Sequence, residues 1–128
     1  MVVDTSALVA VLLDEPEARS FLDRIGGERS SVLSAANYVE LAIVARSRGT
    51  RAQPLIDSLL EELAIAVVPV TMTQAHLAAD AFARFGRRRH AAGLNYGDCF
   101  AYALATERGE PLLFKGNDFP HTDVRQAL

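Results

Sequence analysis

Short apolar runs alternate along the chain with longer segments in which apolar residues recur at helical spacing. The runs lie at 1–3, 31–33, 66–70 and 111–114. They lack the alternating polar residues of a strand with one solvated face, and strands buried on both faces are typical of parallel sheets. The pattern therefore predicts an α/β protein with a mostly parallel sheet covered by helices on both sides. Ligand sites in such folds lie beyond the carboxyl ends of the strands.

Turn and capping residues divide the remaining chain into predicted helices. The expected spans are 6–13, 14–25, 35–48, 52–64, 74–85 and 96–108, with capping residues at Thr5 or Ser6, Ser34, Thr73 and Asn95 and closing glycines at Gly49 and Gly109. Residues 39–45 are apolar on nearly every helical face, which predicts deep packing. The segment 122–124 is a candidate fifth strand, so we expect a sheet of four or five strands.

The composition excludes several classes of protein. With 128 residues and 50% hydrophobic content, the chain is long enough for one domain, expected over 1–128. The single cysteine excludes an internal disulfide and a cysteine-rich zinc site, and it fits a reducing cytoplasm. No apolar run approaches the roughly 20 residues of a membrane span, so we expect no membrane contact. A net charge of −3 means that nucleic acid would be bound by a local patch or through a metal ion.

Four acidic residues lie where the predicted fold would bring them to one edge. Asp4 ends the first strand, Glu40 lies in the helix after the second, Asp98 starts the helix before the fourth, and Asp118 follows that strand. Each has an ordinary alternative. Asp4 can cap a helix, Asp98 can pair with Asn95 in a first turn, and Asp118 can be a loop acid.

Glu40 is the hardest of these acids to explain structurally. It interrupts the apolar stretch 38–45, and no basic residue lies three or four positions away. Burying an unpaired carboxylate costs several kcal/mol, roughly, so a distant arginine or a metal ion would have to compensate. Asn37 lies close enough on the same helix to complete a polar patch. Clustered carboxylates favour a hard cation, Mg²⁺ or Mn²⁺, over zinc.

The chain resembles a known family at these acids. Its opening, MVVDTSAL, is similar to that of PIN-domain ribonucleases, and Glu40 and Asp98 (the latter in NYGDCFA) match the next two acids of that family in order and spacing. The small size and the segment 112–119, LLFKGNDF, resemble the VapC toxins of bacterial VapBC toxin–antitoxin pairs. The resemblance covers essentially the whole chain.

The resemblance implies a three-layer α/β/α PIN-like domain acting as a metal-dependent endoribonuclease. It also implies a homodimer inhibited by a cognate VapB-type antitoxin. Asp4 and Asp98 would hold Mg²⁺ or Mn²⁺, with Glu40 binding directly or through water. Thr5 and Ser6 lie beside the first acid, where they can hydrogen-bond it or a metal-bound water or simply cap the first helix. Asn37 is the third residue expected to support the acids.

One position departs from the family pattern. Many members carry an acid where this chain has Gly116. Either Asn117 or Asp118 substitutes for that acid, or water takes its ligand position. Of these alternatives we favour an Asp118 that orients a metal-bound water.

A basic loop precedes the third acid. Arg87, Arg88 and Arg89 lie within a run of charges that is a candidate for RNA phosphate binding, together with Lys115. The alternative is an ordinary solvated face. Nearby, Tyr96 is expected to pack against the protein, and Cys99 to be a small packed residue and not a nucleophile.

Two other functions use the same residues. A metal-dependent phosphatase or DNA nuclease would need the same acids, although Ser6 stands where an Asp-x-Asp phosphatase has its second acid. A non-catalytic RNA- or partner-binding PIN-like domain is the other alternative, for which Gly116 leaves room.

Overall fold

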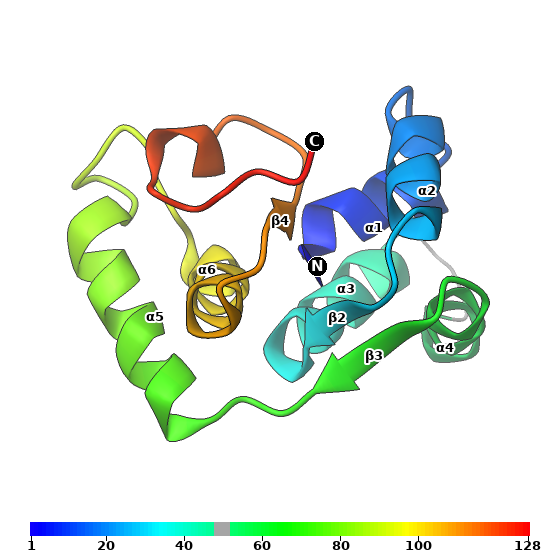
Figure 1. The fold of residues 1–128 in the computed structure, drawn as a ribbon, viewed down its shortest axis with the longest axis horizontal. Helices are drawn as coiled ribbons and strands as arrows, with labels where there is room; N and C mark the ends of the chain where they lie inside the picture. Colours follow the sequence, from blue (N-terminus) through cyan, green and yellow to red (C-terminus); the bar gives the residue numbers. More distant parts are fainter. Residues whose placement is uncertain (48–51) are drawn as a thin grey trace.

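The computed structural model describes residues 1–47 and 52–128. Within them the chain forms four strands, six α-helices and one 3-10 helix (Figure 1). In order these are β1 (Val2–Val3), α1 (Thr5–Leu12), α2 (Ala18–Gly26), β2 (Ser31–Ser34), α3 (Ala35–Ser47), α4 (Ala52–Glu62), β3 (Ile65–Val68), α5 (Met72–Phe85), α6 (Tyr96–Arg108), β4 (Leu112–Leu113) and η1 (Phe119–His121).

The four strands form one parallel sheet in the order β3-β2-β1-β4. The predicted α/β class and parallel sheet are confirmed, but the expected fifth strand at 122–124 is wrong. After η1 the tail meets the sheet through a single bridge, between Leu112 and Gln126. The Leu112 backbone N–H donates to the Arg125 carbonyl and the Leu112 carbonyl accepts from the Ala127 N–H, so the tail pairs with β4 at one residue, beyond 122–124, and does not continue as a strand.

Helices cover both faces of the sheet, and each face has its own apolar core. The core against α1–α4 includes Leu8, Leu33, Leu41, Ile56 and Leu113. The core against α5 and α6 includes Val2, Val32, Leu94, Leu104 and Leu112. Consecutive strand residues such as Leu112 and Leu113 enter opposite cores, as the alternation of side chains along a strand requires. This arrangement confirms the three layers.

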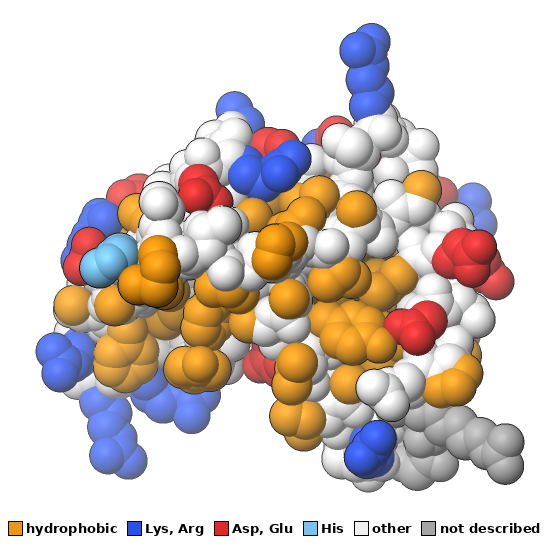
Figure 2. Space-filling model, turned by 90° about the horizontal axis from the view of Figure 1, so that it is seen from below, with side chains coloured by type: hydrophobic (Ala, Val, Ile, Leu, Met, Phe, Trp, Pro, Cys, Tyr) orange, Lys and Arg blue, Asp and Glu red, His pale blue; other side chains and the backbone are white. Residues whose placement is uncertain are grey.

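Burial is less complete than the apolar patterns suggested. On α3, Val39 is 55% and Ile43 65% exposed, so the expectation of deep packing over 39–45 is wrong. This helix belongs to an outer layer, and only its inner stripe, including Leu41 and Ala45, is buried. On the edge strand β3, Val67 is 43% exposed. Hydrophobic side chains accordingly spread over the face seen from below in Figure 2.

Several helices begin at residues other than those predicted. The cap of α1 is Asp4 rather than Thr5 or Ser6, and the cap of α5 is Thr71 rather than Thr73. Helix α2 starts only at Ala18, after a turn over 14–17. By contrast, the caps of α6 at Asn95 and Gly109 are as predicted, the latter with a φ of 62°. The expected end of α3 at Arg48 and Gly49 lies outside the described residues.

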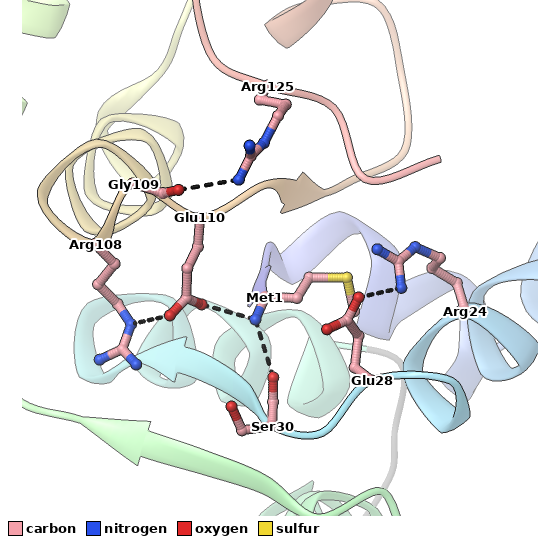
Figure 3. A network of polar contacts seen from close by, with 8 residues as sticks. All are labelled: Met1, Arg24, Glu28, Ser30, Arg108, Gly109, Glu110 and Arg125. Carbon is pink, nitrogen blue, oxygen red and sulfur yellow. Dashed lines mark hydrogen bonds and ion pairs between the residues drawn. The ribbon is translucent and has the colours of Figure 1, made fainter.

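A polar network joins the amino ends of three strands (Figure 3). The buried amino group of Met1 lies 2.7 Å from a Glu110 carboxylate oxygen and donates to the Ser30 carbonyl at 2.9 Å. Glu110 also pairs with Arg108. Burial works against the charge of Glu110, but hydrogen bonds from the amino terminus and Arg108 outweigh it and lower the pKa of that carboxyl. None of the described helices is long and apolar enough to span a membrane.

Truncating a central strand residue tests this layering. Leu33 on β2 is fully buried, whereas its register partner on β3, Val67, is 43% exposed. We expect Leu33→Ala to lower the free energy of unfolding by about 2–5 kcal/mol, because it removes buried methyl groups and leaves a cavity. Val67→Ala should cost much less. Urea unfolding of both variants measures the difference, and equal losses would contradict the assigned layers.

Candidate active site

Chain segments far apart in the sequence meet beyond the carboxyl ends of the strands. Asp4 follows β1, Glu40 comes from α3, Asp98 from the first turn of α6, and Lys115 follows β4. Together they line an open cavity of about 380 Å³. The other residues lining it are Thr5, Ser6, Val9, Glu15, Val44 and Asn95. Three of the four predicted acids therefore lie in one cavity, at the edge that the parallel sheet implied.

Asp4 is fixed through one of its two carboxylate oxygens. Its Oδ2 accepts hydrogen bonds from the Ser6 backbone N–H at 2.9 Å and the Ser6 hydroxyl at 2.6 Å. The same hydroxyl accepts from the Lys115 backbone N–H at 2.9 Å, which links α1 to the segment after β4. The other oxygen, Oδ1, is buried and has no hydrogen-bond partner among the described residues. Asp4 is thus both a helix cap and a carboxylate with a free oxygen.

Glu40 is held by neutral polar groups. The Thr5 hydroxyl donates to Glu40 Oε2 at 2.7 Å, and the buried Asn37 amide donates to the same oxygen at 3.3 Å. The Asn37 amide also donates to the Gly97 carbonyl at 3.0 Å, which ties α3 to α6. The predicted patch of Asn37 and Glu40 is therefore present, and no arginine of residues 1–47 or 52–128 pairs with Glu40.

Gly97 permits the close approach of α3 and α6. A Cβ at this position would lie 2.6 Å from the carboxyl carbon of Glu40, so only glycine leaves room for that carboxylate. The sequence interpretation missed this role. The sequence did contain a signal, namely a glycine within a predicted helix. A glycine there destabilises a helix by about 1 kcal/mol relative to alanine, so its presence indicates a packing role.

Asp98 forms a capping box with Asn95. The Asp98 carboxylate accepts from the Asn95 backbone N–H at 2.8 Å, and the Asn95 side chain accepts from the Asp98 backbone N–H at 2.9 Å. The capping interpretation is therefore correct as well. It holds the half-buried carboxylate of Asp98 at the rim of the cavity, beside the other two acids.

Burial and, to a lesser degree, the neighbouring charges raise the pKa values of two of these acids. Burial raises the pKa of Asp4 to about 6 against the hydrogen bonds from Ser6, and the charge of Glu40 adds to the increase. Burial also raises the pKa of Asp98 to about 7 against the Asn95 backbone hydrogen bond, with further increases from Asp4, Asp118 and Glu40. A cation among these groups would favour their ionised forms.

Lys115 does not supply that cation. Its ammonium lies 2.8 Å from Glu15 and 2.9 Å from Glu17, so two acids of the 14–17 turn neutralise it. These ion pairs were not foreseen, since nothing in the sequence brings that turn to the end of β4. They leave the charges of Asp4, Glu40 and Asp98 without a basic partner in the described chain.

The donor set of the cavity fits a hard divalent cation. Within residues 1–47 and 52–128, no three acidic, His or Cys side chains are already arranged as a complete set of metal ligands. Mg²⁺ needs only one or two carboxylates and retains several waters, so such a set is not required. The free Oδ1 of Asp4 and the nearby carboxylate of Asp98 are oxygen donors of the right kind.

The remaining candidates lie outside the cavity. Asp118 is exposed in the loop after β4, where a φ of 109° at Gly116 turns the chain. Its charge reaches Asp98, as the pKa of that residue shows. The run Arg87–Arg89 is exposed on the loop between α5 and α6 and forms no ion pair within the described part of the chain.

The sequence predicted that two neighbours of Asp98, Cys99 and Tyr96, are packed against the protein, and the structure supports this only for Cys99. Cys99 is buried, and burial together with the charge of Asp98 raises the pKa of its thiol to about 11. It is the packed, unreactive residue that the sequence predicted. Tyr96 is 78% exposed, so the expectation that it packs is wrong. As the first residue of α6 it projects beyond the layers that would cover it.

Comparison with known proteins identifies the family. The PIN domain matches residues 1–125. Ribonuclease VapC28 of Mycobacterium tuberculosis is 51% identical over 130 residues, which cover 100% of this chain and 98% of that protein. The chain belongs to the VapC ribonucleases of the PIN-domain family. Another of these, Ribonuclease VapC of Mycolicibacterium smegmatis, is 49% identical over 97% of both chains.

Solved structures agree on the PIN fold. The crystal structure of Mycobacterium tuberculosis VapC20, described as a sarcin-ricin loop cleaving toxin, has a TM-score of 0.74 at 18% identity and covers 97% of this chain and 98% of that one. A chain of a toxin–antitoxin complex from Klebsiella pneumoniae has a TM-score of 0.72 at 15% identity, covering 95% of this chain and 92% of that one. These structures bear out the predicted fold, and the family match together with the VapC relatives confirms the resemblance to VapC proteins.

Gly97→Ala tests the packing of Glu40. The added methyl group must displace the Glu40 carboxylate, and displacing such supporting groups typically costs about 10- to 100-fold in metal affinity. Titration calorimetry with Mn²⁺ measures this loss. Gly26→Ala is the matched control, because a Cβ there meets nothing within 4 Å. Equal Mn²⁺ affinities for both variants would show that Gly97 has no such role.

Asp98→Asn tests the crowding of the acids. In the folded protein the pKa of Asp98 is about 7, above its unfolded value of roughly 3.9, so the metal-free protein loses stability as pH rises through this range. The variant lacks that contribution. Its unfolding free energy relative to the unsubstituted protein should therefore increase between about pH 4 and 7 and then level off. Urea unfolding in EDTA measures it, with the exposed Asp80→Asn as control. A pH-independent difference would contradict the raised pKa.

Proposed function

We propose that this chain is the toxin of a toxin–antitoxin pair and acts in the cytoplasm as a divalent-metal-dependent endoribonuclease that hydrolyses RNA phosphodiester bonds. The observation that carries the proposal is the cavity in which Asp4, Glu40 and Asp98 meet without a basic partner among the described residues. Its support is full-length similarity, at 51% identity, to proteins named VapC ribonucleases.

Asp4 and Asp98 would hold the metal, which we propose to be Mg²⁺ or Mn²⁺, with Glu40 binding directly or through water. When bound, such an ion polarises a phosphate oxygen and activates water. The chain's own part is positioning. Ser6 orients Asp4, Thr5 and Asn37 orient Glu40, and Asn95 orients Asp98. Asp118, exposed and outside the cavity, would help to orient water near Asp98.

The nucleophile is proposed to be water. Among the residues lining the cavity, Thr5 and Ser6 carry hydroxyls, and both already donate to carboxylates. The Cys99 thiol is buried, and its pKa of about 11 keeps it protonated near neutral pH. Hydrolysis by water therefore needs no covalent intermediate on the protein.

RNA would be drawn to the site by the arginine loop. Arg87, Arg88 and Arg89 are exposed and without ion-pair partners in the described segments, and guanidinium groups bind phosphate in a bidentate way. Lys115 is a weaker candidate than the sequence suggested, because Glu15 and Glu17 already neutralise it. A phosphate would have to displace those contacts.

Protein partners belong to the same proposal. Exposed apolar side chains on α3, Val39 and Ile43, line a shallow cavity of about 200 Å³ with Tyr38 and Ala42. Such surfaces mark protein contacts. We propose that this chain forms a homodimer and binds a VapB-type antitoxin. The similar chain from Klebsiella pneumoniae comes from a toxin–antitoxin complex.

Cleavage by purified protein tests this function. We expect wild-type protein to cleave single-stranded RNA with Mg²⁺ or Mn²⁺ and to stop when EDTA is added. Asp98→Asn should lower the cleavage rate by more than about 100-fold, because it removes a charged ligand and not merely a supporting group. Asp80→Asn, an exposed acid on α5, should leave the rate unchanged.

The same assay separates the alternatives. Comparable turnover of DNA or of a small phosphoester would indicate a DNA nuclease or a phosphatase. RNA binding without metal-dependent turnover would indicate a non-catalytic PIN-like domain. Wild-type rates for Asp98→Asn would remove Asp98 from the active site.

A further inference from the structure

An apolar pocket lies between α5 and α6. It has a volume of about 390 Å³ and is lined by alanines of α5 and by the aromatic rings of Phe82, Tyr96 and Phe100. None of these rings lines the cavity that holds the acids. The function proposed above therefore leaves this pocket unexplained.

Tyr96 is the most exposed part of this pocket. It is 78% exposed, and its ring stands edge-on to Phe100, with centroids 4.9 Å apart and an angle of 73° between the planes. Phe100 thus supports the Tyr96 ring from one side while leaving most of it open to solvent. Tyr96 and Asp98 are two residues apart in the first turn of α6, so their side chains leave the helix on different sides. The pocket and the cavity therefore lie on two sides of the same helix end.

Positive charge flanks the pocket on the α5 side. The arginine loop joins α5 to α6, and the Arg89 guanidinium lies 5.9 Å from the centre of the Phe82 ring. In Figure 2, Lys and Arg side chains gather at the lower left, on the α5 side and next to hydrophobic side chains. Aromatic rings beside a basic strip are typical of surfaces that bind single-stranded nucleic acid.

The charge also argues against a second copy of the chain as the occupant. A symmetric contact between two such pockets would bring two arginine loops together, and the described residues offer Arg87–Arg89 no acidic partner. The negative phosphates of RNA complement the same loop. An unpaired base matches the apolar pocket, because every base has a flat face that stacks on aromatic rings.

The geometry points to Tyr96 as a stacking platform for one unpaired RNA base next to the cleaved phosphodiester, with the arginine loop holding the adjoining phosphates. This inference rests on the proposed ribonuclease function. It adds a reason for selecting single-stranded RNA, because a paired base is not free to leave its stack and enter the pocket.

Binding measurements test the platform in protein that does not cleave. In the Asp98→Asn background, Tyr96→Ala should weaken binding of a single-stranded RNA of about ten nucleotides by roughly 5- to 100-fold, the range expected for one stacked base. Tyr96→Phe keeps the ring and should bind like the background protein. Met72→Ala, 72% exposed and outside the pocket, is the matched control and should also leave affinity unchanged.

A set of RNAs with one abasic ribose each locates the stacked base. The background protein should lose affinity when one particular base is missing, and Tyr96→Ala should show no further loss at that position, because the two changes remove the same contact. Tyr96→Ala should leave the salt dependence of binding unchanged. Arg87→Ala should reduce its slope by about one unit per lost phosphate contact.

Two results would overturn the inference. One is unchanged RNA affinity for Tyr96→Ala with the same abasic profile as the background protein. The other is a Tyr96→Ala variant whose mass in solution changes while RNA affinity does not, which would make the pocket a contact between copies. Both are separate from failure of the proposed function, which would appear as absence of metal-dependent cleavage by the wild-type protein.

Discussion

Repulsion among three carboxylates is the constraint around which this site is organised. Asp4, Glu40 and Asp98 come from three different elements and line one cavity. Lys115 lines it too, but its ammonium pairs with Glu15 and Glu17, so none of the three acids has a basic partner among the described residues. Each is held by neutral donors: Ser6 on the first, Thr5 and Asn37 on the second, and the Asn95 backbone on the third. Such donors position a carboxylate without neutralising it, as the proposed binding of a cation requires.

The rest of the fold supports this arrangement from two sides. The parallel sheet places the ends of β1 and β4 together, and the hydrogen bond from the Lys115 backbone to Ser6 joins the segment after β4 to the start of α1. At the opposite ends of the strands, the Met1 amino group forms an ion pair with Glu110. Because Glu110 lies just before β4, this contact holds the start of β1 close to the start of β4. Gly97 then lets α6 approach α3 closely enough for Glu40 to lie against its first turn.

Local signals account for what could be predicted. The apolar runs located all four strands, and the capping pattern located the capping box of Asn95 and Asp98 at the start of α6. Both features depend only on residues that are close in the sequence. Exposure was predicted poorly. Val39 and Ile43 are apolar yet exposed, and Tyr96 projects into solvent, since burial depends on which helices lie opposite. The pairing of Lys115 with Glu15 also joins residues about 100 positions apart, which no local pattern reveals.

The sequence by itself determined the α/β class and the parallel sheet, because both follow from residue type and short-range spacing, and its motifs indicated the family and singled out three acids that line one cavity. Only the tertiary structure decided which oxygen of Asp4 stays free, why a side chain at position 97 would displace the Glu40 carboxylate, and which side chains remain exposed beside the site. Those properties depend on distances between α1, α3 and α6, and these distances are set by how the layers pack, not by any one segment.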